Sequence, residues 1–131
     1  MRHFYRLQGV VRYYDDYCVA YVDPELSKYY LSLIPKAWDV RPQMWRPHVT
    51  IVRKWIESDH VRRAWWGYRD GEAIDIKVRA GLQADDTYIW LNAVSRDIVS
   101  MRRVLGLPAM RKGFNVQHIT VGNVKHMKEV L

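Results

Sequence analysis

The chain has 131 residues, of which 49% are apolar and 13% aromatic, and this composition favours a folded protein over a disordered one and fits a single domain spanning residues 1–131. The formal net charge of +7 favours an anionic partner such as a nucleotide or RNA, although the Lys and Arg residues are scattered and form no basic arm. No apolar run approaches the ~20 residues that span a bilayer, and no apolar signal segment follows the N-terminus. We therefore expect a cytoplasmic protein with no membrane partner.

The start of the chain predicts a β-hairpin followed by a helix. Residues 7–14 and 17–22 are rich in β-branched and aromatic side chains, and residues 15–16, both Asp, supply a turn between them. Residues 23–25, Asp-Pro-Glu, combine an N-cap, a first-turn proline and an acidic residue, and the apolar residues that follow have helical spacing until Pro35. We therefore expect two paired strands and then a helix.

The middle of the chain is less regular. Residues 36–46 predict a loop, and residues 46–53 predict a strand because they form an apolar, β-branched run. Residues 54–71 place Trp and Tyr among charges and fit either a short helix followed by a loop or a mobile flap. The single cysteine, Cys18, excludes an internal disulfide, and we expect it to be a buried small hydrophobic residue.

The second half repeats the order of the first. Its predicted elements are a strand at 72–80 with one wet face, a strand at 87–94, a helix at 95–105, a basic loop at 109–115, a strand at 116–121 and a short helix or tail at 124–131. The duplicated order predicts two halves, about 1–71 and 72–131. We expect an α+β fold in which two pseudo-symmetric lobes of antiparallel strands, with flanking helices, surround a central cleft.

Each half contains one His-x-Thr motif in a predicted strand. Since side chains alternate along a strand, His48 and Thr50 share one face, and so do His118 and Thr120. The chain has five His and three Thr, so chance would supply roughly 0.1 such motifs. Two strands that each present an imidazole and a hydroxyl could hold a phosphate between them, with one His as general base and the other as general acid.

Other uses of these residues fit the sequence less well. Neither motif has the spacing of a zinc site, and no Cys pair or carboxylate lies at ligand spacing beside His48 or His118. No serine lies in a Gly-x-Ser-x-Gly turn, and no Gly-rich phosphate loop is present. We therefore expect no metal site and no cofactor.

The motifs also carry a family resemblance. Residues 47–53 and 118–123 resemble the signature of the 2H phosphoesterase superfamily, the LigT-like proteins named for two His-x-Thr/Ser motifs. The small tailed-phage branch of that superfamily is similar to this chain at residues 6–11, 23–26, 28–30, 32–36 and 105–108. Members of this branch are anti-CBASS proteins, which cleave the cyclic oligonucleotide signals of bacterial antiphage defence.

The resemblance implies a metal-independent phosphodiesterase that cleaves 3′–5′ bonds of cyclic di- and trinucleotides as a phage counter-defence. It implies catalytic roles for His48, Thr50, His118 and Thr120. The expected partner is a cyclic oligonucleotide substrate, with no stable protein partner. If a phage encodes the chain, the expected location is the host cytoplasm. Which His is the acid and which the base stays open.

Aromatic and basic residues are candidates for binding the substrate, because aromatic rings stack on bases and cations contact phosphates. The candidates are Tyr13, Tyr14, Trp90 and the loop residues Arg111 and Lys112, and for each aromatic residue burial in the core is the alternative. We predict Tyr14 and Lys112 as substrate-binding residues and expect Trp90 to pack inside.

Two other functions remain open at this point. One is a 2H enzyme that acts on RNA, as a 2′,3′-cyclic phosphate or 2′–5′ phosphodiesterase or as a ligase, with the same four residues. The other is a non-catalytic nucleotide-binding protein, which the basic charge and the aromatic content would also serve.

Overall fold

The computed structural model describes residues 4–35, 40–42, 45–111, 113–114 and 116–124. Of the short helix or tail expected at 124–131, only Val124 belongs to the described residues. The elements are, in order, β1 (Phe4–Tyr13), β2 (Cys18–Tyr21), α1 (Pro24–Ser32), β3 (Val40–Pro42), β4 (His48–Val52), the 3-10 helices η2 (Ser58–His60) and η3 (Arg63–Trp65), β5 (Ala73–Arg79), β6 (Gln83–Ala84), β7 (Tyr88–Val94), α2 (Arg96–Val104) and β8 (Gln117–Val124).

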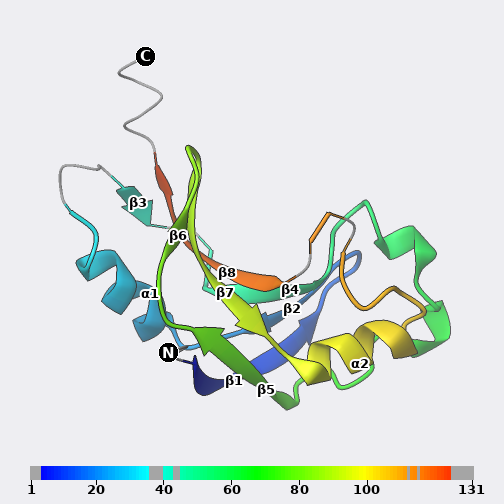
Figure 1. Cartoon of the computed structure of the whole chain (residues 1–131). Helices are drawn as coiled ribbons and strands as arrows, with labels where there is room; N and C mark the ends of the chain where they lie inside the picture. The colour runs from blue at the N-terminus through cyan, green and yellow to red at the C-terminus, as the bar shows by residue number, and fades with distance from the viewer. Residues whose placement is uncertain (1–3, 36–39, 43–44, 112, 115, 125–131) are drawn as a thin grey trace.

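The strands form one antiparallel sheet that closes into a barrel (Figure 1). Their order is β3-β8-β4-β2-β1-β5-β7-β6, and β8 also pairs with β7, so the six strands β8-β4-β2-β1-β5-β7 make a closed ring. The short strands β3 and β6 pair with β8 and β7 outside the ring. Closure satisfies the backbone groups that the edge strands of an open sheet would expose.

The expected arrangement of two pseudo-symmetric lobes around a central cleft is therefore wrong. The strands of the two halves are joined at both seams of the ring, β1 to β5 and β4 to β8. Each strand of the ring contributes at least one inward side chain that is no more than 1% exposed, among them Val11, Ala20, Val49, Ile76, Leu91 and Ile119. These side chains belong to one apolar core, which fills the space where the cleft was expected.

The predicted hairpin and first helix are confirmed. β1 and β2 pair from Val10 opposite Tyr21 to Tyr13 opposite Cys18, and Cys18 is fully buried, as expected. Asp23 caps α1, because its Oδ1 accepts a hydrogen bond of 3.0 Å from the backbone N–H of Glu25. α1 ends before Pro35, as predicted, and contacts β8 and β3.

The second helix, α2, is also confirmed and covers one end of the barrel. It contacts β4 and β5, which lie on opposite sides of the six-stranded ring. Its N-cap Ser95 accepts from the backbone N–H of Ile98 at 3.2 Å and donates to the carbonyl oxygen of Asp75 at 2.7 Å. No helix in the described parts of the chain has the length and apolar character needed to cross a membrane.

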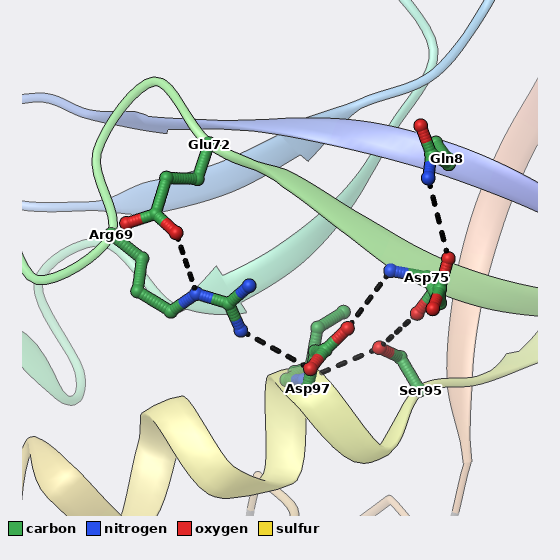
Figure 2. Close-up of polar contacts among 7 residues, drawn as sticks. Gln8, Arg69, Glu72, Asp75, Ser95 and Asp97 are labelled. Atoms are coloured by element: carbon green, nitrogen blue, oxygen red, sulfur yellow. Dashed lines mark hydrogen bonds and ion pairs between the residues drawn. The ribbon is translucent and has the colours of Figure 1, made fainter.

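A polar network fixes the start of α2 against β5 (Figure 2). Asp97 accepts hydrogen bonds from the backbone N–H of Asp75 at 2.9 Å and from Nη1 of Arg69 at 3.1 Å. Arg69 also pairs with Glu72 at 3.3 Å. The hydrogen bond from the backbone N–H of Asp75 lowers the pKa of Asp97, burial raises it, and the hydrogen bond and charge of Arg69 lower it. The net pKa is below its ordinary value, so Asp97 stays ionised at neutral pH.

The strands β5, β7 and β8 confirm the strands predicted for the second half, whereas β6 has no counterpart among the predicted elements, and the middle of the chain also differs. β5 alternates buried and exposed residues, as expected for a strand with one wet face. The stretch 54–71 contains the two 3-10 helices instead of an α-helix. β3 lies within the segment expected to be a loop, and its three residues pair with the end of β8. A strand this short has too few residues to show a period in the sequence.

Candidate functional site

The two His-x-Thr motifs lie on neighbouring strands. Val49, the middle residue of the β4 motif, pairs with Ile119, the middle residue of the β8 motif, and both side chains are buried, at 1% and 0% exposure. Because side chains alternate along a strand, the residues on either side of this pair lie on the outer face of the barrel. These four half-buried residues are His48, Thr50, His118 and Thr120.

The register of this ladder crosses the two motifs. Val49 and Ile119 are the paired residues, and the antiparallel register continued by one residue to either side puts His48 opposite Thr120 and Thr50 opposite His118. The Cβ atoms of directly opposite residues are ~4.5–5.5 Å apart. Each imidazole is therefore next to the hydroxyl of the other motif. We call these four residues the His–Thr patch.

Backbone contact holds His48 in one tautomer. Its Nδ1 lies 2.8 Å from the carbonyl oxygen of Arg46, a group that only accepts hydrogen bonds, so Nδ1 carries the hydrogen. Tyr21 lies opposite His48 in the β2–β4 ladder and presents its ring at 74° to the imidazole, with 6.1 Å between the ring centres. Nε2 is therefore the nitrogen of His48 that can exchange a proton with a ligand.

His118 is in a different environment. Its ring stacks on Phe114 with 5.5 Å between the centres and 22° between the planes. Burial, then the positive charge of Arg111 and then His48 lower the pKa of His118 from 6.5 to about 4. His118 is therefore neutral at physiological pH in the ligand-free protein.

This lowered pKa predicts the pH dependence of one proton resonance and of stability. In a proton NMR titration, we expect the ring of His118 to titrate near pH 4 and its pKa to rise in an Arg111→Gln variant, which removes a repelling charge. Between pH 6.5 and about 4 His118 binds a proton in the unfolded chain but not in the folded protein, and this favours unfolding. The contribution of His118 to the free energy of unfolding is therefore full above pH 6.5 and is lost as the pH falls to about 4. A midpoint for His118 at 6.5 would contradict this environment.

Arg111 places a fixed positive charge beside the patch. With Thr50 and His118 it lines a small crevice, and its guanidinium lies 4.4 Å from the ring centre of Phe114. Burial and the charge of Arg53 lower the pKa of Arg111, and Glu57 opposes this effect. The guanidinium nevertheless stays charged at neutral pH and can pair with a phosphate.

Two cavities of similar size flank the patch. One, of about 640 Å³, contains His118 and Thr120 together with Tyr88, Trp90 and Asn92. Trp90 lies opposite Thr120 in the β7–β8 ladder and donates from Nε1 to Oδ1 of Asn92 at 3.0 Å. The expectation that Trp90 packs inside is wrong, because its strand position alternates with the buried Ile89 and Leu91 and so faces outward.

The other cavity, of about 650 Å³, contains His48. Its remaining lining residues are the aromatic residues Tyr14, Tyr17, Tyr21 and Trp45, the basic residues Arg12, Arg46 and Lys54, and Val19. We call it the tyrosine–cation cavity. Of the two predicted substrate-binding residues, the structure brings Tyr14 next to the patch through this cavity, whereas Lys112 lies outside the described residues.

Most of the other residues around the patch leave no signal in the local sequence. Tyr21 lies beside His48 because β2 pairs with β4, and Arg46 contacts His48 through its backbone carbonyl. Neither contact follows from a local pattern in the sequence. Tyr13 is turned away: its hydroxyl donates to the carbonyl oxygen of Tyr68 at 2.8 Å, and its ring packs edge-on against Trp66. Alternation along β1 is the signal that separates Tyr13 from its exposed neighbours.

Comparisons with protein-family models, curated proteins and solved structures found no match to this chain. Within the described residues, no group of three or more His, Cys, Asp or Glu side chains is placed to hold a metal ion. The geometry of the patch and of the two cavities is therefore the basis for assigning a function.

Proposed function

We propose that this protein is a phosphodiesterase that cleaves 3′–5′ bonds of cyclic di- and trinucleotides with its two His-x-Thr motifs and without a metal ion. The observation that carries the proposal is the pairing of Val49 with Ile119, which puts the two motifs on adjacent strands with His48, Thr50, His118 and Thr120 on one outer face. The resemblance of both motifs to the 2H superfamily supports the same chemistry. The β4–β8 ladder brings the four side chains together without requiring a two-lobed fold.

In this proposal the patch surrounds the scissile phosphate. The hydroxyls of Thr50 and Thr120 donate hydrogen bonds to the nonbridging oxygens, and the charge of Arg111 offsets the negative charge that grows there. Such donors accelerate the reaction when they bind the transition state more strongly than the bound substrate.

The environments of the two histidines suggest their roles. His118, neutral at physiological pH, takes the proton of the ribose 2′-OH as general base, and the 2′ oxygen attacks phosphorus. The P–O5′ bond breaks, and His48, which enters this step as the imidazolium with a hydrogen on each nitrogen, gives the proton of Nε2 to the leaving 5′ oxygen and keeps the hydrogen on Nδ1. The products are a 2′,3′-cyclic phosphate and a 5′-OH, so that atoms and protons balance without a co-reactant.

One assay tests the proposed activity. The protein is incubated with a panel of cyclic di- and trinucleotides in EDTA, and the products are separated by chromatography. We expect linear products with 2′,3′-cyclic phosphate ends, because two imidazoles and two hydroxyls replace the functions of a metal ion. Activity that EDTA abolishes and a divalent ion restores would contradict the metal-free mechanism. Cleavage of RNA ends alone would favour the RNA enzyme, and intact ligand would favour a binding protein.

The location and the biological role follow from this substrate. The resemblance places such a substrate in bacterial antiphage defence, and we propose that the protein acts in the host cytoplasm. Removal of such a signal is the counter-defence role that the resemblance implies.

A further inference from the structure

We infer that the tyrosine–cation cavity is a subsite for a second nucleotide, whose own phosphate binds to Arg12, Arg46 and Lys54. The inference rests on the proposed function for the position of the scissile phosphate at the His–Thr patch. It adds a requirement on the substrate: a second phosphate on the His48 side of the scissile bond, as a cyclic dinucleotide has and a dinucleoside monophosphate lacks.

Three cations supply the charge of this subsite. The side chains of Arg12, Arg46 and Lys54 are exposed and line the cavity together with His48. None of the three forms an ion pair with an acidic side chain in the described parts of the chain. Asp15 and Asp16 lie in the nearby turn between β1 and β2 but do not line the cavity. A cavity with this lining favours an anion.

Aromatic rings hold two of these cations in place. The guanidinium of Arg46 lies 5.1 Å from the ring centre of Tyr21, and Nζ of Lys54 lies 5.5 Å from that of Tyr17. Cation–π contacts of this kind position a charge without neutralising it. Both cations therefore keep their charge available to a ligand.

The same rings can bind a base. Tyr14 and Tyr17 stack with 4.5 Å between their centres and 12° between their planes, and the hydroxyls of Tyr14 and Tyr21 are in contact at 2.5 Å. Burial and the hydrogen bond with Tyr14 raise the pKa of Tyr21 to about 12, so its hydroxyl keeps its proton. Trp45, 72% exposed, forms another wall with an aromatic face. Aromatic faces next to cations are the usual surroundings of a bound nucleotide.

The cavity beside His118 differs in charge and therefore in what it can take. It contains the carboxylate of Asp85 and the amide of Asn92 beside Tyr88 and Trp90. These groups suit the edge and face of a base better than a phosphate. The two cavities thus place one base on each side of the scissile phosphate and the second phosphate on the His48 side only.

Binding measurements test this inference independently of turnover. The ligands are cyclic di-AMP, with two phosphates, and adenylyl-(3′→5′)-adenosine, which has the same bases and linkage but one phosphate. Their dissociation constants are measured by calorimetry for His118→Ala and for His118→Ala combined with Arg12→Gln and Lys54→Gln. The matched control combines His118→Ala with Lys77→Gln, because Lys77 is an exposed cation on β5, which is not adjacent to β4 in the ring.

We expect the Arg12→Gln and Lys54→Gln changes to raise the dissociation constant of cyclic di-AMP by about tenfold or more and that of the one-phosphate ligand by less than about twofold. Only cyclic di-AMP has the second phosphate, so only its complex loses charge-assisted hydrogen bonds. The Lys77→Gln control should leave both ligands unaffected. Equal weakening of both ligands, no weakening, or failure of His118→Ala to bind cyclic di-AMP would overturn the subsite. Specific weakening of cyclic di-AMP in a protein whose wild type cleaves neither ligand would instead overturn the proposed catalysis and leave the subsite standing.

Discussion

Replacement of His48 or His118 by alanine is expected to remove nearly all turnover of a cyclic dinucleotide, lowering kcat by about 10²–10⁴-fold, the usual contribution of a general acid or base. In the proposed mechanism each imidazole carries one of the two proton transfers, His118 as base and His48 as acid. Rates are measured with purified variants in EDTA at saturating substrate, so that the loss is assigned to the chemical step and not to binding.

The fold should survive both substitutions. His48 and His118 are half-buried on the outer face of the barrel, and the core residues next to them are unchanged. Circular dichroism and thermal unfolding check this directly. His60→Ala is the matched control, because His60 is an exposed histidine in η2 and does not line either cavity. Full activity of either patch variant, or a loss of activity in His60→Ala as well, would refute the assigned roles.

Local pattern was sufficient to predict most of the elements. The hairpin, both helices and the two motif strands follow from alternation, from the helical spacing of apolar residues, from the cap Asp23 and from the breaker Pro35. The closure of the barrel could not be predicted in the same way, because it depends on pairings between distant strands, β1 with β5 and β4 with β8. A repeated order of elements fits two separate lobes and one shared ring equally well.

The candidate site shows the same division. Alternation correctly put the histidine and threonine of each motif on one face, but the crossed register depends on the pairing of Val49 with Ile119. Trp90 misled the prediction because a large aromatic side chain favours burial on average, whereas its strand position faces outward. Burial and the neighbouring charge that lower the pKa of His118 are set by tertiary contacts and leave no local signal.

A buried ion pair contacts both β4, the strand of the first motif, and the segment that precedes β8, the strand of the second motif. The guanidinium of Arg102, on α2, bonds to both carboxylate oxygens of Glu57, at 2.7 and 3.0 Å, and the two side chains are 2% and 12% exposed. Arg102 also donates to the carbonyl oxygen of Ile51 at 2.7 Å and to that of Pro108 at 2.8 Å. Ile51 follows Thr50, and Pro108 precedes the loop that leads to β8.

Arg102→Met is expected to lower the free energy of unfolding by about 3–5 kcal/mol, because it leaves a buried carboxylate without its partner. Urea denaturation measures the loss. The control is Arg103→Met, a change of the neighbouring exposed arginine that should cost less than about 0.5 kcal/mol. Adding Glu57→Leu to Arg102→Met should recover part of the loss, since the unpaired charge is removed. Equal stabilities of Arg102→Met and Arg103→Met would refute this role of the pair.

The same pair predicts how the difference between wild type and Arg102→Met changes with pH. Burial alone raises the pKa of Glu57, but hydrogen bonds from Arg102 and from the backbone N–H of Arg53, with the charge of Arg102, lower it below its ordinary 4.5. In the wild type, stability from Glu57 is therefore full above pH 4.5 and is lost as the pH falls through the lowered pKa. Without Arg102, burial raises the pKa, and Glu57 takes up a proton on mild acidification, which relieves the unpaired charge. The difference in unfolding free energy between the wild type and Arg102→Met should thus be largest near neutral pH and shrink as the pH falls towards 4.5. A difference that stays constant with pH would mean that the loss comes from the contacts of Arg102 with Ile51 and Pro108 alone.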